Sequence, residues 1–124
     1  LNLNKNWRFL VGFDLGMQQK YLQANEYNFW YSPIFISQFS FNDKLKAAIR
    51  FEHYQDKKNI IVAIAENTPF VLNGLSLNTD YFIRPNLLFR MELRGLYSSA
   101  DVFRTDLSQT TNNRFFATSM AYKF

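Results

Sequence analysis

The sequence predicts an all-β protein, an antiparallel up-and-down meander of about six long strands that forms part of a transmembrane β-barrel. Apolar and polar residues alternate over stretches close to the ~9–11 residues with which a tilted strand crosses a bilayer, whereas soluble strands usually have about 5–6. Aromatic residues make up 19% of the chain although its mean hydropathy is -0.25, which suits strands that are apolar on one face. Long and short connections also alternate along the chain.

The composition excludes several other classes. No linker-like shift divides the chain, so residues 1–124 predict a single β-barrel segment. No run approaches the roughly 18 apolar residues of a membrane helix. The basic residues behind the net charge of +4 are spread out, which argues against a nucleic-acid partner. There is no cysteine for disulfides or thiolate metal sites. The chain starts at Leu1 without a signal segment, so we expect the C-terminal portion of a longer precursor.

Residues 7–18 form the clearest predicted strand. Period two places its apolar residues on one face, because successive side chains of a strand point in opposite directions. These residues are Trp7, Phe9, Val11, Phe13, Leu15 and Met17. Residues 19–28 predict a loop and residues 29–41 a second strand, in which the pattern does not fix the facing of residues 30–36. Pro33 cannot donate to a ladder and predicts a bulge or a strand end.

The parity of the flanking residues predicts two tight turns. A three-residue loop at 42–44 would pair Phe41 with Leu45, apolar beside apolar, whereas a two-residue loop would set Phe41 against Lys44. A three-residue loop at 84–86 would likewise pair Ile83 with Leu87. Further strands are predicted over residues 45–54, 72–82, 87–97 and 113–124. Residues 55–71 and 98–112 predict long connections, the first with a short extra strand or a strand extension at 60–65.

The order of the connections predicts an orientation. Outer-membrane barrels have short periplasmic turns and long external loops, so residues 42–44, 84–86 and the C-terminus would lie at the periplasmic side. Aromatic residues near the strand ends would then form belts at the two membrane interfaces. The inner belt would comprise Trp7, Phe41, Tyr81, Tyr122 and Phe124, and the outer belt Phe29 or Tyr31, Phe51, Tyr97 and Phe116.

The end of the chain, residues 113–124, alternates between a large apolar face and a small or polar one. The apolar set comprises Phe116, Thr118, Met120, Tyr122 and Phe124. This ending resembles the terminal strand of Gram-negative outer-membrane β-barrels. The resemblance implies that the apolar set is a membrane-insertion signal, read by the barrel insertion machinery. It also implies that the protein lies in the outer membrane of a Gram-negative bacterium.

Three further segments carry a closer likeness. They read A-A-I-R-F-E-H-Y-Q-D (residues 47–56), L-S-L-N-T-D-Y with N-L-L-F-R-M-E-L-R (75–81 and 86–94), and residues 98–103. With the terminal strand they resemble the β-barrel porins of the OmpL-like family, which show R-x-E on upward strands, a tight turn before each, and a final Phe. The resemblance implies an outer-membrane channel for small solutes. The chain would correspond to only the last six strands, the others coming from the upstream chain or other subunits.

One set of charged and polar residues shares the parity opposite to the apolar face and is predicted to point inward. It comprises Lys46, Arg50, Glu52, Asn78, Asp80, Arg90, Glu92 and Arg94. An Arg or Lys at the lipid midplane would cost about 2–4 kcal/mol, so this face is expected to be wet or internally paired. The set predicts either a pore wall whose field favours anionic solutes or Arg–Glu pairs that hold the register and plug a narrow interior.

The sequence predicts no enzyme, no cofactor and no metal site. The single histidine, His53, has the parity of the apolar face, away from any inward Ser or Asp partner. Glu52 and Glu92 each have an Arg two residues away on the same face, which would hold both ionised. Asp101 and Asp106 could bind calcium but lack a regular spacing.

The sequence therefore predicts a porin-like channel for passive diffusion of small, possibly anionic, solutes, with outer-membrane lipid and the insertion machinery as partners. One alternative is a non-conducting barrel that scaffolds a protein complex. Another is a soluble lipocalin-like module whose aromatic face encloses a ligand. A sealed core around Phe9, Phe51, Phe89 and Met120 would contradict the membrane prediction.

Overall fold

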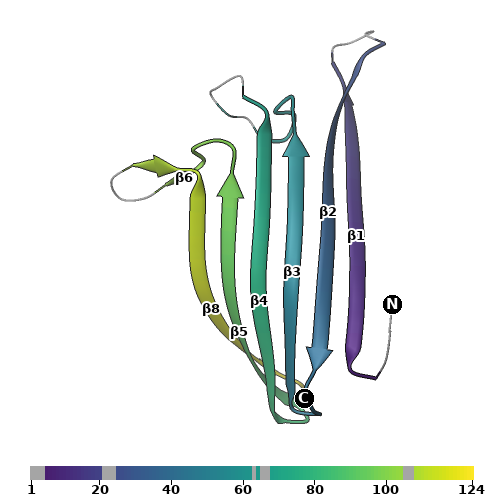
Figure 1. The fold of residues 1–124 in the computed structure, drawn as a ribbon, viewed down its shortest axis with the longest axis vertical. Helices are drawn as coiled ribbons and strands as arrows, with labels where there is room; N and C mark the ends of the chain where they lie inside the picture. Colours follow the sequence, from purple (N-terminus) through teal and green to yellow (C-terminus); the bar gives the residue numbers. More distant parts are fainter. Residues whose placement is uncertain (1–4, 21–24, 63, 65–67, 105–107) are drawn as a thin grey trace.

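The computed structural model describes residues 5–20, 25–62, 64, 68–104 and 108–124. Six long strands form one antiparallel sheet in the order β1-β2-β3-β4-β5-β8 (Figure 1). They are β1 (Trp7–Gln19), β2 (Tyr27–Ser40), β3 (Leu45–Asp56), β4 (Phe70–Arg84), β5 (Leu87–Ser98) and β8 (Asn112–Tyr122). The predicted six-strand meander is confirmed. The last long connection, predicted as a loop, contains a short hairpin of β6 (Phe103–Arg104) and β7 (Gln109–Thr110).

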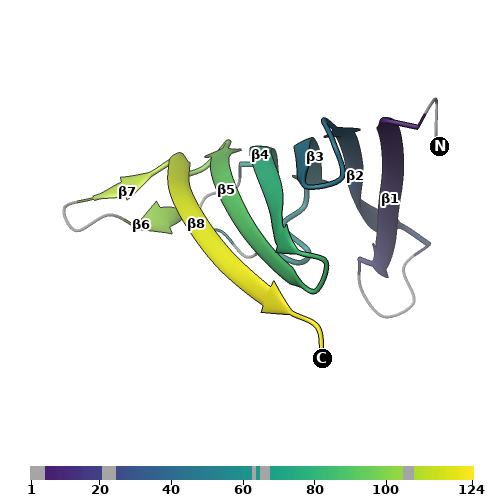
Figure 2. The ribbon, with the colours of Figure 1, turned by 90° about the horizontal axis from the view of Figure 1, so that it is seen from below.

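The sheet is open. Strands β1 and β8 are its two edges, and Figure 2 shows them at opposite ends when the sheet is viewed from below. An edge strand presents a row of backbone N–H and C=O groups to whatever lies beside it. The described chain therefore forms a section of a wall and not a closed barrel.

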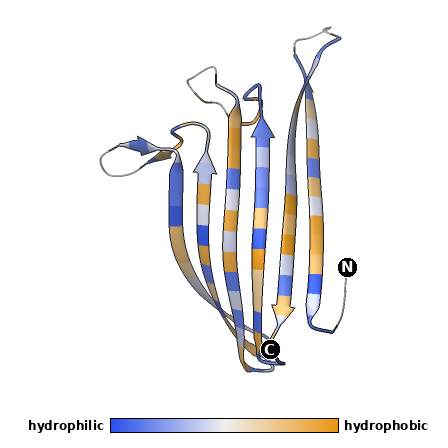
Figure 3. Ribbon diagram, in the orientation of Figure 1, coloured by the Kyte–Doolittle hydropathy of each residue, from blue (hydrophilic) through white to orange (hydrophobic). Residues whose placement is uncertain are grey.

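The registers divide the side chains between two faces across the six strands, and parity changes only at the end of β4, where Arg84 lies opposite Leu87 on the outer face. Opposed residues include Trp7 with Phe39, Phe39 with Ala47, Leu45 with Tyr81, Tyr81 with Phe89, and Phe89 with Met120. We call the face with odd-numbered residues in β1–β5 and even-numbered residues in β8 the outer face, and the opposite one the inner face. Bands of contrasting hydropathy along the strands make the alternation visible (Figure 3).

The two faces differ in exposure, and the predicted membrane assignment is consistent with the difference. Most large apolar residues of the outer face are exposed, from Trp7 at 39% to Val11 at 75%. The buried residues of the long strands lie on the inner face, where Asp56 is 0%, Ser76 2% and Asp80 8% exposed. Side chains crowd together on the concave side of a bent sheet, so this pattern indicates that the sheet bends toward its inner face. No sealed core encloses the outer-face residues.

The parity of residues 30–36 follows directly from the register with β1. Phe35 lies opposite Val11 and Tyr31 opposite Leu15, so both are on the outer face, while Trp30 and Ile36 are on the inner one. The bulge or strand end predicted at Pro33 is wrong, because β2 runs through Pro33 with its register unchanged on both sides. The missing N–H is accommodated by a gap, since the pairing with β3 omits residues 32 and 33.

The first tight turn matches its prediction. The Phe41 N–H donates to the Leu45 carbonyl at 2.9 Å, which closes a three-residue loop. The side chain of Asn42 caps that loop, since its Oδ1 accepts from the backbone N–H groups of Lys44 and Leu45, each at 2.8 Å. This is the local hydrogen bonding that favours Asn in turns.

The second turn differs from its prediction. Arg84, and not Ile83, lies opposite Leu87, and the register shifts between Phe82 and Arg84. The turn proper is therefore the two residues Pro85 and Asn86, and Ile83 is the extra residue of a β-bulge. The difference from the prediction has a physical reason: a bulge accommodates one extra residue without changing the facing of Tyr81 or of the residues that precede it in β4.

The ends of the sheet agree with the predicted alternation of connections. The two short turns lie at one end together with the C-terminus, and the longer connections lie at the other (Figure 1). The Lys123 N–H donates to the Asn86 carbonyl at 2.9 Å, and the Phe82 N–H donates to the Lys44 carbonyl at 2.8 Å. We call this the turn end, and the opposite one the loop end.

Two connections at the loop end carry their own polar contacts. Lys20 Nζ donates to Glu26 Oε2 at 2.6 Å, and this hydrogen bond lowers the pKa of Glu26 below its ordinary value. The carboxylate of Asp56, at the end of β3, accepts from the backbone N–H groups of Ile61 at 2.8 Å and Val62 at 3.3 Å. The short strand or extension predicted for 60–65 is wrong for the described residues 60–62 and 64, which carry no strand.

Candidate functional site: the charged inner face

All eight residues predicted to point inward lie on even positions of β3, β4 and β5, and therefore on the inner face. The registers arrange them in rows across the sheet. One row is Lys46, Asp80 and Arg90; the next holds Asn78 and Glu92; a third holds Arg50, Ser76 and Arg94; and Glu52 lies opposite Gly74. Each acidic residue thus has a cationic residue in its own row or in an adjacent one.

Asp80 and Arg90 form the best-ordered ion pair of the face. Arg90 Nε donates to Asp80 Oδ1 at 2.6 Å and Arg90 Nη2 to Oδ2 at 2.7 Å. Two parallel charge-assisted bonds fix both the distance and the plane of the pair. Lys46, the other neighbour of Asp80, instead places its ammonium 5.1 Å from the centre of the Phe82 ring. That distance suits a cation–π contact, so the Lys46 charge is not neutralised by an ion pair among the described residues.

Glu52 connects the two charged strands. Its Oε2 accepts from Arg50 Nη2 at 2.7 Å on its own strand, and its Oε1 accepts from Arg94 Nη2 on β5. The second bond passes over β4, which lies between the two strands. Asn78 and Asp80 lie on β4 between these two strands, on the same face. Asp80 does bond β5, but Asn78 donates to Ser76 Oγ at 3.2 Å, within β4.

Gly74 makes the crossing possible, and sequence reasoning missed it. A Cβ on Gly74 would overlap the Glu52 side chain, which therefore lies flat across β4. Ser76, 2% exposed, is the small residue that follows it on the inner face. The available signal was a glycine placed by register directly opposite a carboxylate, between two strands rich in Arg.

A hollow of about 300 Å³ lies on the inner face among these residues. Its charged lining comprises Lys46, Arg50, Asp80, Arg90, Glu92 and Arg94. Four of these side chains are cationic and two are acidic. With Glu52, the carboxylate that Arg50 and Arg94 share, the group keeps one net positive charge.

The predicted belt residues lie on the outer face. Trp7, Phe41 and Tyr81 are near the turn end, Tyr31 and Tyr97 are near the loop end, and Phe51 is closer to mid-strand, opposite Phe35 and Leu75. Rings cluster at the turn end, where Trp7 and Phe39 have centroids 4.8 Å apart and Phe39 and Phe41 4.9 Å apart. Their role as membrane belts stays a prediction.

The predicted insertion signal also lies along one face. Phe116, Thr118, Met120 and Tyr122 are outer-face residues of β8, and Phe124 follows the strand. The Tyr122 and Phe124 rings meet edge to face with centroids 5.3 Å apart. These side chains form an uninterrupted exposed row along an edge strand. Its recognition by the insertion machinery stays a prediction.

The residues considered for chemistry do not converge. His53 Nδ1 hydrogen-bonds Asn73 Oδ1 at 2.8 Å on the outer face, beside the Tyr31 ring. Asp101 lies in the last connection, and Asp106 lies outside the described residues. Within the described ranges, no three His, Cys, Asp or Glu residues are placed to hold a metal ion. Nor do those ranges contain a helix that is long and apolar enough to span a membrane.

The geometry defines a class of protein. A meandering antiparallel sheet of 11–15-residue strands, apolar on one face and ion-paired on the other, is a section of a β-barrel wall. The sequence profile of one family matches residues 1–124, and its description is "Putative beta-barrel porin-2, OmpL-like". The chain belongs to this family, as the resemblance of its segments predicted. No curated protein and no solved structure matched the chain.

Proposed function

We propose that this chain forms six strands of an outer-membrane channel for the passive diffusion of small solutes, with the inner face lining the pore. The observation that carries the proposal is the confinement of charge. Lys46, Arg50, Arg90, Arg94 and their acidic partners all share the inner face, opposite a face of exposed aromatic and aliphatic residues. Each Arg or Lys moved to the lipid side would cost about 2–4 kcal/mol at the midplane.

The proposed orientation in the Gram-negative outer membrane places the turn end in the periplasm and the loop end outside. The turn end holds both short turns and the C-terminus with Phe124. This arrangement is expected for a barrel folded by the insertion machinery. Trp7, Phe41, Tyr81 and Tyr97 would lie at the level of the lipid headgroups.

The proposed channel needs further strands. A transmembrane barrel usually has at least about eight, and both edges of this sheet are unpaired in the described chain. We expect these strands to come from the upstream part of the same protein or from other subunits, and to join through β1 and β8. The family's porin description supports this assembly.

We further propose that the channel prefers anionic solutes. The hollow beside Lys46, Arg50, Arg90 and Arg94 keeps a net positive charge after its ion pairs are counted. Lys46 is the most available cation, because its ammonium rests on the Phe82 ring and not on a carboxylate. A solute carboxylate or phosphate in transit would therefore meet an open positive site.

Each of the two alternative functions depends on a different face of the sheet. In a non-conducting scaffold, the ion pairs of Glu52 and Asp80 would fill the interior of the barrel. These ion pairs are the main observation in favour of the scaffold. A lipocalin-like module would enclose the aromatic face. The high exposure of that face and the crowding of the inner face speak against the second alternative.

The test is a reversal-potential measurement on the full-length protein in planar bilayers under a KCl gradient. We expect discrete conductance steps with chloride preferred over potassium, and a preference reduced by at least twofold in Lys46→Gln. Arg84→Gln, a change at the turn end outside the inner face, serves as the control and should leave the preference unchanged. Sealed bilayers at every protein loading would support the scaffold instead, and cation preference would overturn the anionic assignment.

A further inference from the structure

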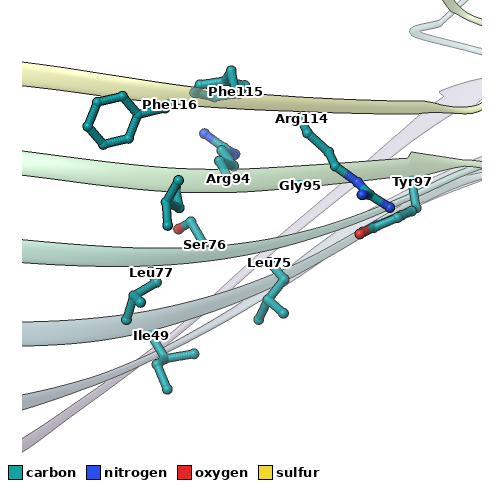
Figure 4. A pocket seen from close by; sticks show the side chains of 11 residues that line it. Ile49, Leu75, Ser76, Leu77, Arg94, Gly95, Tyr97, Arg114, Phe115 and Phe116 are labelled. Carbon is teal, nitrogen blue, oxygen red and sulfur yellow. The ribbon is translucent and has the colours of Figure 1, made fainter.

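The outer face carries a groove that its role as a plain lipid contact does not require. The groove has a volume of about 700 Å³, and its apolar lining includes Ile49, Leu75, Leu77, Leu93 and Phe116 from four neighbouring strands (Figure 4). Its size falls within the roughly 300–1,000 Å³ of small-molecule sites. Most of its lining is apolar, as a hydrocarbon chain would need.

One outer-face position in the lining of the groove lacks a side chain. Gly95 lies between Leu93 and Tyr97 on β5 and opposite Leu75 on β4. A Cβ built on Gly95 would lie 3.2 Å from both Cε2 and the hydroxyl of Tyr97. The Tyr97 ring therefore folds back over the glycine and bounds the groove toward the loop end.

Arg114 lies at the same end of the groove. It is the residue opposite Gly95 on β8, and it occupies an outer-face position. Among the strand residues that the registers pair on the outer face, only Arg114 and the turn-end Arg84 are charged. None of the ion pairs among the described residues involves Arg114, and its side chain is exposed. An unpaired cation on a lipid-facing wall calls for an anionic partner near the headgroups.

From this arrangement we propose that the outer face binds one phosphorylated lipid of the leaflet at the loop end. An acyl chain fills the groove along Leu75, Leu93 and Phe116, and the lipid phosphate lies at the Arg114 guanidinium beside Tyr97. Charge complementarity selects the occupant, because a guanidinium pairs well with a phosphate, while the other outer-face residues that line the groove carry no charge. The inference rests on the proposed membrane placement of the outer face and goes beyond it by naming a specific lipid site.

The test is native mass spectrometry of the full-length protein released from detergent micelles with lipid A as the probe. We expect one lipid A to be retained per barrel. Arg114→Gln, which removes the charge, and Gly95→Leu, whose side chain would push the Tyr97 ring out of place and so alter that wall of the groove, should each reduce the retained fraction at least fivefold. Arg84→Gln should retain as much as the unsubstituted protein, since it removes the other outer-face cation from the opposite end of the sheet.

Two further arms separate the possible failures. Glucose 1-phosphate, a phosphate without acyl chains, should not displace the lipid even in large excess, whereas displacement would mean that the headgroup alone is recognised. The shift in electrophoretic mobility on heating reports barrel formation independently. Lipid retained equally by all variants, or by none while every variant forms a barrel, would overturn the lipid site but not the channel. Failure to form a barrel in any micelle would count against the membrane placement itself.

Discussion

Gly74 and Gly95 sit almost side by side in the sheet yet shape opposite faces. Gly74 lies opposite Leu96, and its neighbour Leu75 lies opposite Gly95. On the inner face, the missing side chain of Gly74 lets Glu52 reach across β4 to Arg94. On the outer face, the missing side chain of Gly95 lets the Tyr97 ring lie over it, where the ring bounds an apolar groove. The same omission therefore makes room for a directed ion pair on one face and for an aromatic ring at the end of an apolar groove on the other.

The two faces of the sheet are stabilised in different ways. Inner-face side chains are held by directed bonds to partners on neighbouring strands, such as Asp80 with Arg90. Outer-face side chains touch mainly other apolar groups and leave much of their surface exposed. A bilayer would supply the missing contacts of the outer face, whereas the inner face already satisfies most of its charges within the protein.

The strongest test of this difference is a charge moved from one face to the other. Leu77→Arg places a cation near mid-strand on the outer face, and we expect it to reduce the free energy of unfolding by about 2–4 kcal/mol. Asn78→Arg places the same cation on the next residue, facing inward, where its cost should be much smaller. Urea unfolding of the full-length protein in lipid vesicles would measure both. Equal losses would contradict the assignment of the faces.

A smaller effect is expected when one inner-face pair is broken. Asp80→Asn removes the charged acceptor of Arg90 and leaves that guanidinium without its carboxylate. Breaking a buried pair costs about 3–5 kcal/mol, but the Arg90 side chain is 49% exposed, so solvent screening should reduce the loss to roughly 1–2 kcal/mol.

A double-mutant cycle sharpens that measurement. Arg90→Gln combined with Asp80→Asn should recover part of the loss, because the double variant leaves no unpaired charge. The same urea titration gives all the free energies of the cycle. Additive losses would show that the two hydrogen bonds contribute no coupling, and that the inner face is not held by directed pairs.

Outside residues 30–36, the facing of the side chains could be predicted from the sequence because it depends on parity alone. The length of the first turn could be predicted for the same reason, since Phe41 and Leu45 share a face only across a three-residue loop. The second turn could not be predicted this way. A three-residue loop and a two-residue loop with a bulge at Ile83 both leave Tyr81 and Phe89 on the outer face. Alternation carries no signal that separates the two.

The inner-face residues could likewise be predicted, whereas their partners could not. Period two places Glu52 and Arg94 on the inner face, but which groups meet depends on the stagger of the strands and on what lies between them. The Glu52–Arg94 contact depends on a glycine in the intervening strand. The bulge predicted at Pro33 was wrong for a related reason. The missing N–H of Pro33 leaves a gap in the pairing of β2 with β3, while the pairing of β2 with β1 continues unchanged.

The smallest effects are expected for alanine substitutions at two inner-face glycines, Gly74 and Gly12. The change in the free energy of unfolding should have opposite signs at the two positions. Gly74→Ala would push the Glu52 side chain away from Arg94, and because that side chain is flexible we expect a loss of at most about 1 kcal/mol. Gly12→Ala places its methyl group in ordinary contact, 3.9 Å from the Ile34 Cβ, and no described glycine has a positive φ. We therefore expect a gain of about 0.4–1 kcal/mol from the reduced entropy of the unfolded chain.

Urea unfolding in vesicles again gives both free energies, and the conductance readout separates packing from electrostatics. In Gly74→Ala, displacement of the Glu52 carboxylate should weaken its hydrogen bond with Arg94. This changes the electrostatic field of the inner face, so we expect the chloride preference to change together with the free energy of unfolding. Gly12→Ala should alter stability alone, since it lies two strands away from the charged rows. A Gly74→Ala variant with unchanged stability and unchanged ion preference would mean that the crossing over β4 contributes nothing, and that each strand's charges act independently.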